Sequence, residues 1–288
     1  MNAGVEVQST CTVRVTGGLG NQLFQYAAGR ALAMRLDCRL MLDVSFYRKG
    51  RHRVFALSQF PIKADVGQMT GASFGLSRWS SLIRGVFGNE KTYREPHFHF
   101  DPNFDSLTPP VVLEGYFQSY RYCQGWEQQI RTDLEVPMPT DSESLRLADQ
   151  IANVEATVLH IRRGDYISSP KASRIYAPCT LEYYKRAMEQ IPGKDPVLVL
   201  SDDMDWARRN VPAVKPLLFP VANAIRPAMA DLWLMTKACH HIIANSSFSW
   251  WGAWLAKESS GRKIAPRNWF NDPAINDSDL IPNNWVRL

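Results

Sequence analysis

Two arginines end an apolar run at residues 156–161, in the segment His160-Ile161-Arg162-Arg163-Gly164-Asp165-Tyr166. The run predicts a buried strand, and open α/β sheets bind ligands at the carboxyl ends of their strands. A guanidinium presents a planar fork of N–H donors to phosphate oxygens, and a nearby carboxylate such as Asp165 can hold that fork in position. The segment therefore predicts a phosphate site. An exposed Arg/Asp pair that only closes a loop is the alternative.

Ser201-Asp202-Asp203 follow a second apolar run, at residues 197–200. A carboxylate at the end of this strand can accept hydrogen bonds from the N–H groups of guanine, which is the role we favour. Two alternatives remain open. An aspartate can cap the helix expected from Asp205, or Asp203-Met204-Asp205 can hold a metal ion.

Asn245-Ser246-Ser247-Phe248 follow a third apolar run, at residues 241–244, and open an expected helix at 248–257. Hydroxyls and unpaired backbone N–H groups at a helix start bind anions. A simple N-cap by Ser246 or Ser247 is the alternative, and the two roles are compatible because several donors are available.

A glycine-rich turn, Gly17-Gly18-Leu19-Gly20, joins an expected strand at 12–15 to a helix at 22–36 capped by Asn21. Leu23 stands where a dinucleotide fingerprint has Gly or Ala for close helix packing, which weakens a nicotinamide site. The turn is either a tight connection or a loop whose N–H groups face a polar ligand.

The order of the expected elements predicts two successive α/β units. Further strands are expected at 39–43, 111–113 and 216–219, and helices at 119–134, 181–190, 205–210 and 228–238. Pro137-Met138-Pro139, followed by a capping-type start, predicts a domain boundary at 137–155. Helices between the strands indicate parallel sheets.

The composition of the chain limits the classes of ligand that it is expected to bind. The net charge of +5 is scattered, without a run of five Lys or Arg, which favours a local phosphate site over a nucleic-acid or lipid surface. Five cysteines without a CxxC pair are typical of reduced thiols in a cytoplasmic protein, and the short apolar stretch at 11–15 predicts neither a signal sequence nor a membrane anchor. Cys239, His240 and His241 are predicted to be structural, because neighbouring strand residues point to opposite faces.

These segments, together with Gly115-Tyr116-Phe117-Gln118-Ser119 and the aromatic stretch at 248–254, resemble in order and spacing the α-1,2-fucosyltransferases of glycosyltransferase family 11. The resemblance spans nearly the whole chain and is strongest to bacterial members that decorate surface polysaccharide. The H-x-R-R-x-D element alone is shared with α-1,6- and protein O-fucosyltransferases. It therefore indicates GDP-fucose more strongly than it indicates the linkage.

The resemblance implies an α/β fold of GT-B type, with two Rossmann-like domains facing a cleft: an acceptor-side domain at residues 1–150 and a GDP-fucose-binding domain at 151–288. It implies inverting transfer of L-fucose from GDP-β-L-fucose to the 2-hydroxyl of a terminal galactose in O-antigen synthesis, with no cofactor and no metal ion. The implied partners are GDP-fucose and a galactoside glycan. Nucleic acid is not expected, and contact with the inner face of the membrane is at most peripheral.

The resemblance also assigns residues. Arg162 holds the β-phosphate, where a cation stabilises charge that grows in the transition state. The catalytic set is Arg162, His160 and Asp165. The other donor residues are Arg163, Ser201, Asp202, Asp203, Asn245, Ser246, Ser247 and Phe248. Four residues are assigned to either the donor or the acceptor: Gly18, Gly20, Asn21 and Gln22. Three are assigned to the acceptor: Tyr116, Gln118 and Ser119. The base is left open among Asp43, His97, Glu114 and Asp165, and a dissociative mechanism needs none.

Other functions remain as alternatives. They are a fucosyltransferase with α-1,3 or α-1,6 linkage, a metal-dependent GT-A enzyme using Asp203-Met204-Asp205 or Asp277-Ser278-Asp279, and an RNA- or carbohydrate-binding module that stacks ligands on its nine tryptophans.

Overall fold

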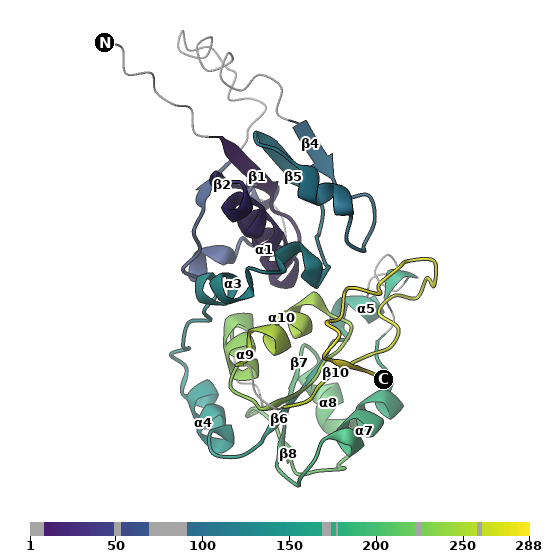
Figure 1. The fold of residues 1–288 in the computed structure, drawn as a ribbon. Helices are drawn as coiled ribbons and strands as arrows, with labels where there is room; N and C mark the ends of the chain where they lie inside the picture. Colours follow the sequence, from purple (N-terminus) through teal and green to yellow (C-terminus); the bar gives the residue numbers. More distant parts are fainter. Residues whose placement is uncertain are drawn as a thin grey trace, which may run out of the picture. The chain divides into compact units, whose positions relative to one another are not determined.

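The computed structural model describes residues 9–48, 53–68, 91–168, 174–176, 178–222, 226–257 and 261–288. The chain divides into two units, Met1–Leu134 and Glu135–Leu288 (Figure 1). The sequence placed the division after residue 150, whereas helix α4 (Ser142–Ile151) already belongs to the second unit. Asp141 starts this helix by accepting a hydrogen bond from the Ser144 N–H at 2.8 Å.

Unit 1 is built on a parallel sheet of five strands in the order β3-β2-β1-β5-β4. The strands are β1 (Thr10–Arg14), β2 (Arg39–Asp43), β3 (Asp65–Gly67), β4 (Lys91–Arg94) and β5 (Val111–Glu114). Helix α1 (Leu19–Arg35) packs on β1 so closely that a Cβ at Gly29 would lie 2.3 Å from the side chain of Val13. The other elements in the described part of this unit are η1 (Ser45–Tyr47), η2 (Leu57–Gln59), η3 (Pro102–Ser106), η4 (Tyr120–Cys123) and α3 (Glu127–Asp133).

Helix α1 begins three residues before the expected Gln22, with Gly18 rather than Asn21 at its N-cap. The Gly18 carbonyl accepts from the N–H groups of Asn21 and Gln22 at 3.0 and 3.1 Å, which closes the first turn early. Gly17 has φ of +79°, and a Cβ there would lie 2.8 Å from Asn21 Nδ2. The turn therefore needs glycine at this position.

Unit 2 is a parallel sheet of six strands in the order β11-β10-β9-β6-β7-β8. The strands are β6 (Thr157–Ile161), β7 (Val197–Ser201), β8 (Leu217–Leu218), β9 (His240–Ile242), β10 (Lys263–Ala265) and β11 (Val286–Arg287). The chain runs from β6 outward to β8 and returns to pair β9 with the other edge of β6. The topological switch point, where α/β sheets bind ligands, therefore lies between β6 and β9.

Helices cover both faces of this sheet, which explains its continuous apolar runs. Leu159 and Ile161 pack with α7 (Leu181–Gln190) and α8 (Met204–Asn210), whereas Val158 packs with α4 and α9 (Ala228–Met235). Successive strand residues point to opposite faces, so every residue of β6 is buried. The short helix α5 (Gly164–Ser168) follows β6, and α10 (Ser247–Leu255) follows β9.

The tryptophans are mostly core residues. Trp250, Trp251 and Trp254 of α10 are buried, as are Trp233, Trp269 and Trp285, while Trp79 lies outside the described residues. Buried indoles do not provide stacking platforms for a nucleic acid.

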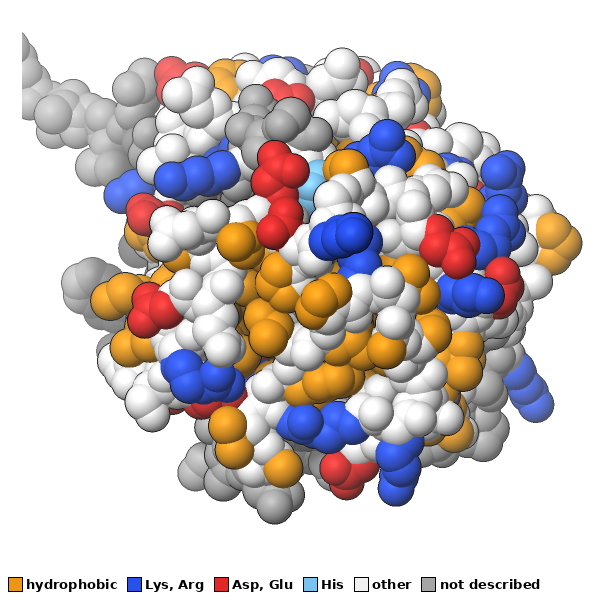
Figure 2. Space-filling view, turned by 90° about the horizontal axis from the view of Figure 1, so that it is seen from below, with side chains coloured by type: hydrophobic (Ala, Val, Ile, Leu, Met, Phe, Trp, Pro, Cys, Tyr) orange, Lys and Arg blue, Asp and Glu red, His pale blue; other side chains and the backbone are white. Residues whose placement is uncertain are grey.

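The charges on the face seen in Figure 2 are mixed in sign around a central gathering of apolar side chains. Within the described residues, no helix is both long and apolar enough to cross a membrane.

Asp133 provides a test of the unit 1 fold. Its carboxylate is buried and accepts from Tyr26 Oη at 2.9 Å and Arg30 Nε at 2.7 Å, joining α3 to α1. We expect Asp133→Ala to lower the free energy of unfolding by about 3–5 kcal/mol, because the buried Tyr26 hydroxyl and the Arg30 guanidinium, whose side chain is 20% exposed, both lose their acceptor. Urea unfolding measures the loss. Asp105→Ala removes the exposed partner of Arg35 and should cost less than about 1 kcal/mol. Equal costs for the two variants would contradict this role of Asp133.

Candidate active site

Asp202, directly after β7, holds the turn that follows β6. Its Oδ1 accepts from the Arg163 N–H at 2.9 Å, and its Oδ2 accepts from the Gly164 N–H at 3.1 Å. The same Oδ2 lies 3.1 Å from Arg162 Nη1. A Cβ at position 164 would lie 2.7 Å from this oxygen, so glycine is needed for the close approach.

The two arginines of this turn have different surroundings. Arg163 donates from Nε to Asp203 Oδ2 at 3.2 Å, and its guanidinium lies 3.7 Å from the ring centroid of Trp206. Asp203 also accepts from the Trp206 N–H at 3.2 Å and so caps α8, as one of the sequence alternatives proposed. Arg163 is therefore braced within unit 2. The Arg162 side chain stays 26% exposed at the switch point.

His160 is buried beside Arg162, and its Nδ1 forms a hydrogen bond with Ser249 Oγ of α10. Burial, with a smaller contribution from the charge of Arg162, lowers the pKa of His160 to about 3. The imidazole is therefore neutral near neutral pH and is not a protonated acid. Ser249 lies within the predicted segment that follows β9 but was not predicted to be a site residue.

Asn245 ties three segments of unit 2 together. Its Nδ2 donates to the Trp269 carbonyl at 3.1 Å, its Oδ1 accepts from Cys179 Sγ at 3.5 Å, and its carbonyl accepts from Tyr166 Oη at 2.8 Å. Ser246 occupies the N-cap position of α10 without a side-chain capping bond, and Ser247 is the first residue of the helix. The buried Asn245 amide is thus a brace at the switch point.

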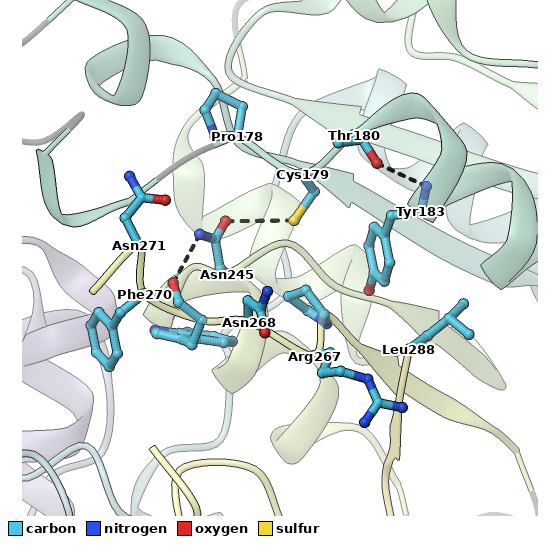
Figure 3. Close-up of a pocket in the computed structure, with 12 residues that line it drawn as sticks. Pro178, Cys179, Thr180, Tyr183, Asn245, Arg267, Asn268, Phe270, Asn271 and Leu288 are labelled. Atoms are coloured by element: carbon cyan, nitrogen blue, oxygen red, sulfur yellow. Dashed lines mark hydrogen bonds between the residues drawn. The ribbon is translucent and has the colours of Figure 1, made fainter. Parts of the chain in front are cut away.

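A pocket of about 320 Å³ lies at the carboxyl ends of β9 and β10 (Figure 3) and includes Asn245, Trp269 and Phe270 in its lining. An aromatic row connects it to the arginine turn. The Arg162 guanidinium lies 6.0 Å from the Tyr166 ring, Tyr166 stacks on Tyr176 at 5.0 Å, and Tyr176 lies 5.5 Å from Phe270. The sequence missed this row because single aromatic residues far apart in the chain carry no motif.

Most of the predicted site residues of unit 1 make structural contacts, and one of them is exposed. The Gln22 amide is fully buried and bonds the backbone of Val54 and Ala56, each at 2.9 Å, so it braces the chain. Gln118 donates to Asn21 Oδ1 at 3.0 Å, and Ser119 caps η4. Tyr116 is 41% exposed, and its side chain can reach a ligand. Gly18 and Gly20 form the start of α1.

The structure shows the contacts of further predicted residues, although the side chain of one of them cannot be placed. The backbone of Asp165 belongs to α5, but its side chain lies outside the described part of the structure. Asp43 accepts from the Ser45 N–H at 3.0 Å, and Ser201 Oγ accepts from the Asp203 N–H at 2.9 Å. Phe248 packs against the core on the α9 face of the sheet and lies 5.5 Å from the His160 ring.

The described residues contain no group of three or more His, Cys, Asp or Glu side chains able to hold a metal ion. Asp277, proposed for a metal-dependent alternative, lies 3.1 Å from Arg287 Nη2 and accepts from the Trp269 N–H. His241 bonds the Met235 carbonyl at 2.8 Å, and His240 accepts from the Arg262 N–H at 2.8 Å. Asp277, His240 and His241 thus have structural partners.

Two α/β units, each built on a parallel sheet, are the architecture of GT-B glycosyltransferases. The second unit has a cationic turn at its switch point. The chain matches the model of glycosyl transferase family 11 over residues 91–288 and belongs to this family, as predicted. It is 31% identical to an α-1,2-colitosyltransferase of Escherichia coli, over 97% of this chain and 99% of the relative. It is 32% identical to the Escherichia coli O-antigen biosynthesis glycosyltransferase WbnK, over 95% and 99% of the two chains.

The chain is also similar to more distant fucosyltransferases. Identity to galactoside α-(1,2)-fucosyltransferase 1 of Saimiri boliviensis boliviensis is 25%, over 87% of this chain and 66% of the relative. The structure of an Arabidopsis thaliana FUT1 mutant in complex with GDP matches with a TM-score of 0.52 at 12% identity, over 97% of this chain and 76% of that chain. The predicted fold class, two Rossmann-like units of GT-B type, is confirmed.

The buried His160 gives a pH prediction. The unfolded chain protonates this histidine near pH 6.5 and the folded protein only near pH 3, so stability is lost as the pH falls through that interval. At pH 5 this histidine should cost the wild type about 2 kcal/mol relative to pH 7. Urea unfolding of His160→Asn at both pH values should show a correspondingly smaller loss. The exposed His97→Asn variant should behave as wild type. A His160→Asn loss as large as the wild-type loss would contradict the prediction.

Proposed function

We propose that the protein transfers L-fucose from GDP-β-L-fucose to the 2-hydroxyl of a terminal galactose, with inversion and without a divalent metal ion, in bacterial surface polysaccharide synthesis. The α-1,2 linkage, the O-antigen context and the galactoside acceptor each occur in the name of a relative. The observation that carries the proposal is Arg162, partly exposed at the switch point and oriented by Asp202.

Arg162 suits the leaving group of this reaction. The transition state resembles an oxocarbenium ion while negative charge grows on the departing β-phosphate, so donors aimed at that phosphate stabilise it selectively. A guanidinium can provide two parallel N–H donors to phosphate oxygens. The start of α10, where Ser246 and Ser247 lie, provides further N–H groups with the positive end of the helix dipole.

In this proposal, the main role of Asp202 and Asp203 is to hold the two arginines and not to recognise guanine. Both oxygens of Asp202 and both of Asp203 already accept hydrogen bonds within unit 2. A carboxylate can accept about four hydrogen bonds, so a guanine N–H could still bond to a remaining lone pair of either residue. We assign Asp202 to orienting Arg162 and Asp203 to bracing Arg163, because these are the arginine contacts that the two carboxylates make.

Colitosyl transfer is a second candidate, because one relative of almost equal length is a colitosyltransferase. Colitose is fucose without its 3-hydroxyl, so the two donors differ by one hydrogen-bonding group. A site built to bond that hydroxyl discriminates strongly against the deoxy sugar, whereas an apolar site does not. Parallel assays with GDP-fucose and GDP-colitose separate the two candidates.

The direct test is incubation with GDP-fucose and a panel of small β-galactosides, followed by location of the new glycosidic bond by NMR. A new α-1,2-fucosyl galactoside, formed equally well in excess chelator, is expected. Transfer to another position would remove the linkage assignment, and loss of activity in chelator would remove the metal-independent mechanism.

Arg162→Lys tests the two-pronged contact. Lysine keeps the charge but cannot reproduce two parallel N–H donors, so we expect turnover to fall on the order of 100-fold, nearly as far as in Arg162→Ala. Arg146→Lys is a matched control, because Arg146 makes an exposed two-pronged contact with Glu143 in the same unit. It should keep normal turnover. A lysine variant at position 162 with near-normal turnover and GDP affinity would refute the role of Arg162.

A further inference from the structure

Unit 1 has a pocket of about 600 Å³ at the carboxyl ends of β1, β4 and β5. This end of a parallel sheet is where α/β folds bind ligands. The lining includes Arg14, Glu95, His97, Phe98, Glu114 and Tyr116. Tyr116 was predicted to contact the acceptor, whereas Arg14 and Glu95 were not singled out by any sequence motif.

The walls of the pocket are held in place before any ligand enters. Glu95 Oε2 accepts from the N–H groups of Tyr116 and Phe117 at 2.7 and 2.9 Å, and Phe117 has φ of +54°. A Cβ at Gly115 would lie 2.5 Å from the Glu95 Cβ, so the two segments meet closely. Glu95 is therefore a positioning residue for Tyr116.

Arg14 is likewise oriented. Glu114 forms ion pairs with both Arg14 and Arg94, and Arg14 Nε lies 4.0 Å from Asp43 Oδ2. The Arg14 side chain is nevertheless 43% exposed, so part of it faces solvent. His97, which also lines the pocket, stacks on His99 with ring centroids 3.5 Å apart and is itself exposed.

The charge balance of this pocket points to the class of its ligand. Carboxylates surround its arginine, so it has no excess positive charge to attract a phosphate. It combines a guanidinium donor, carboxylate acceptors and the faces of aromatic and imidazole rings. Sugar hydroxyls both donate and accept, and mixed polar groups beside aromatic rings are the kind of lining that orients such a ligand.

We propose that this pocket binds an uncharged, polyhydroxylated ligand, the acceptor galactoside, with Arg14 and Tyr116 in direct contact and Glu95 and Glu114 as positioning residues. The identification of the ligand as the acceptor rests on the proposed function. The placement of a sugar site at these residues rests on the geometry of unit 1.

The kinetic test uses Arg14→Gln and Tyr116→Ala. Initial rates are measured with methyl β-galactoside varied at saturating GDP-fucose, and then with GDP-fucose varied at saturating galactoside. We expect the KM for the galactoside to rise about tenfold or more, the factor for losing one hydrogen bond to a charged group or one ring contact, while the KM for GDP-fucose changes less than about twofold. An unchanged galactoside KM, or an equal rise in both KM values, would overturn the proposal.

Arg39→Gln is the matched control. Arg39 lies at the amino end of β2 in the same sheet, with a comparable exposed ion pair to Asp65, and is remote from the pocket lining. It should leave both KM values unchanged. Glu95→Gln keeps an oxygen for the two backbone N–H groups and should raise the galactoside KM less than Tyr116→Ala does.

A binding measurement separates this proposal from the proposed function. Saturation-transfer NMR with methyl β-galactoside and the wild-type protein needs no donor and no turnover. If wild type transfers no fucose but shows saturation transfer that Arg14→Gln loses and Arg39→Gln keeps, the proposed function fails and the sugar site stands. No saturation transfer to wild type, or signals equal in both variants, would overturn the sugar site.

Discussion

The carboxylate of Asp202 is the contact on which the site of unit 2 depends. It accepts from two successive backbone N–H groups, at Arg163 and Gly164, and lies in ion-pair distance of Arg162. A buried or half-buried carboxylate with several donors is a rigid anchor, because each bond to a charged acceptor is stronger than a neutral one. The turn after β6 is therefore held at three successive residues by one carboxylate, which also orients the Arg162 side chain.

The same construction occurs in unit 1. Glu95 follows β4 and accepts from the N–H groups of Tyr116 and Phe117, which follow β5, the neighbouring parallel strand. In both units a glycine, Gly164 or Gly115, allows the approach, since a Cβ there would lie 2.7 Å or 2.5 Å from the carboxylate residue. Parallel strands end at the same edge of a sheet, so a side chain after one strand is well placed to hold the turn after the next.

Much of unit 2 could be predicted from the sequence because its information is local. The apolar runs at β6, β7 and β9 identify strands that are buried on both faces, and the order of elements identifies parallel sheets. The start of α1 at Leu19 and the short strands β3, β4, β10 and β11 were missed. Two to four residues carry too little pattern, and Gly18 caps α1 through its backbone rather than its side chain.

The contacts that hold each site residue in place could not be predicted, because they join residues that are distant in the sequence. Arg162 and Arg163 are adjacent and identical in type, yet only the structure shows Arg163 stacked on Trp206 and bonded to Asp203. Likewise, nothing near Glu95 in the sequence indicates its bonds to a turn 21 residues later. A motif identifies which residues follow a strand. The contacts of each of these residues depend on the segment that follows the neighbouring strand.

Under the proposed function, the partner of Arg162 also bears on catalysis. A carboxylate beside a phosphate-binding arginine reduces the net attraction for an anion, and this effect acts on the bound donor as well as on the transition state. Its benefit is orientation. A guanidinium already held in place needs no reorganisation when charge grows on the departing phosphate, and only stabilisation that is greater in the transition state than in the bound donor accelerates the reaction. In the proposed reaction, the pairing with Asp202 thus lowers the affinity of Arg162 for phosphate and increases its preorganisation, which suits a site that would have to release a nucleotide product after each transfer.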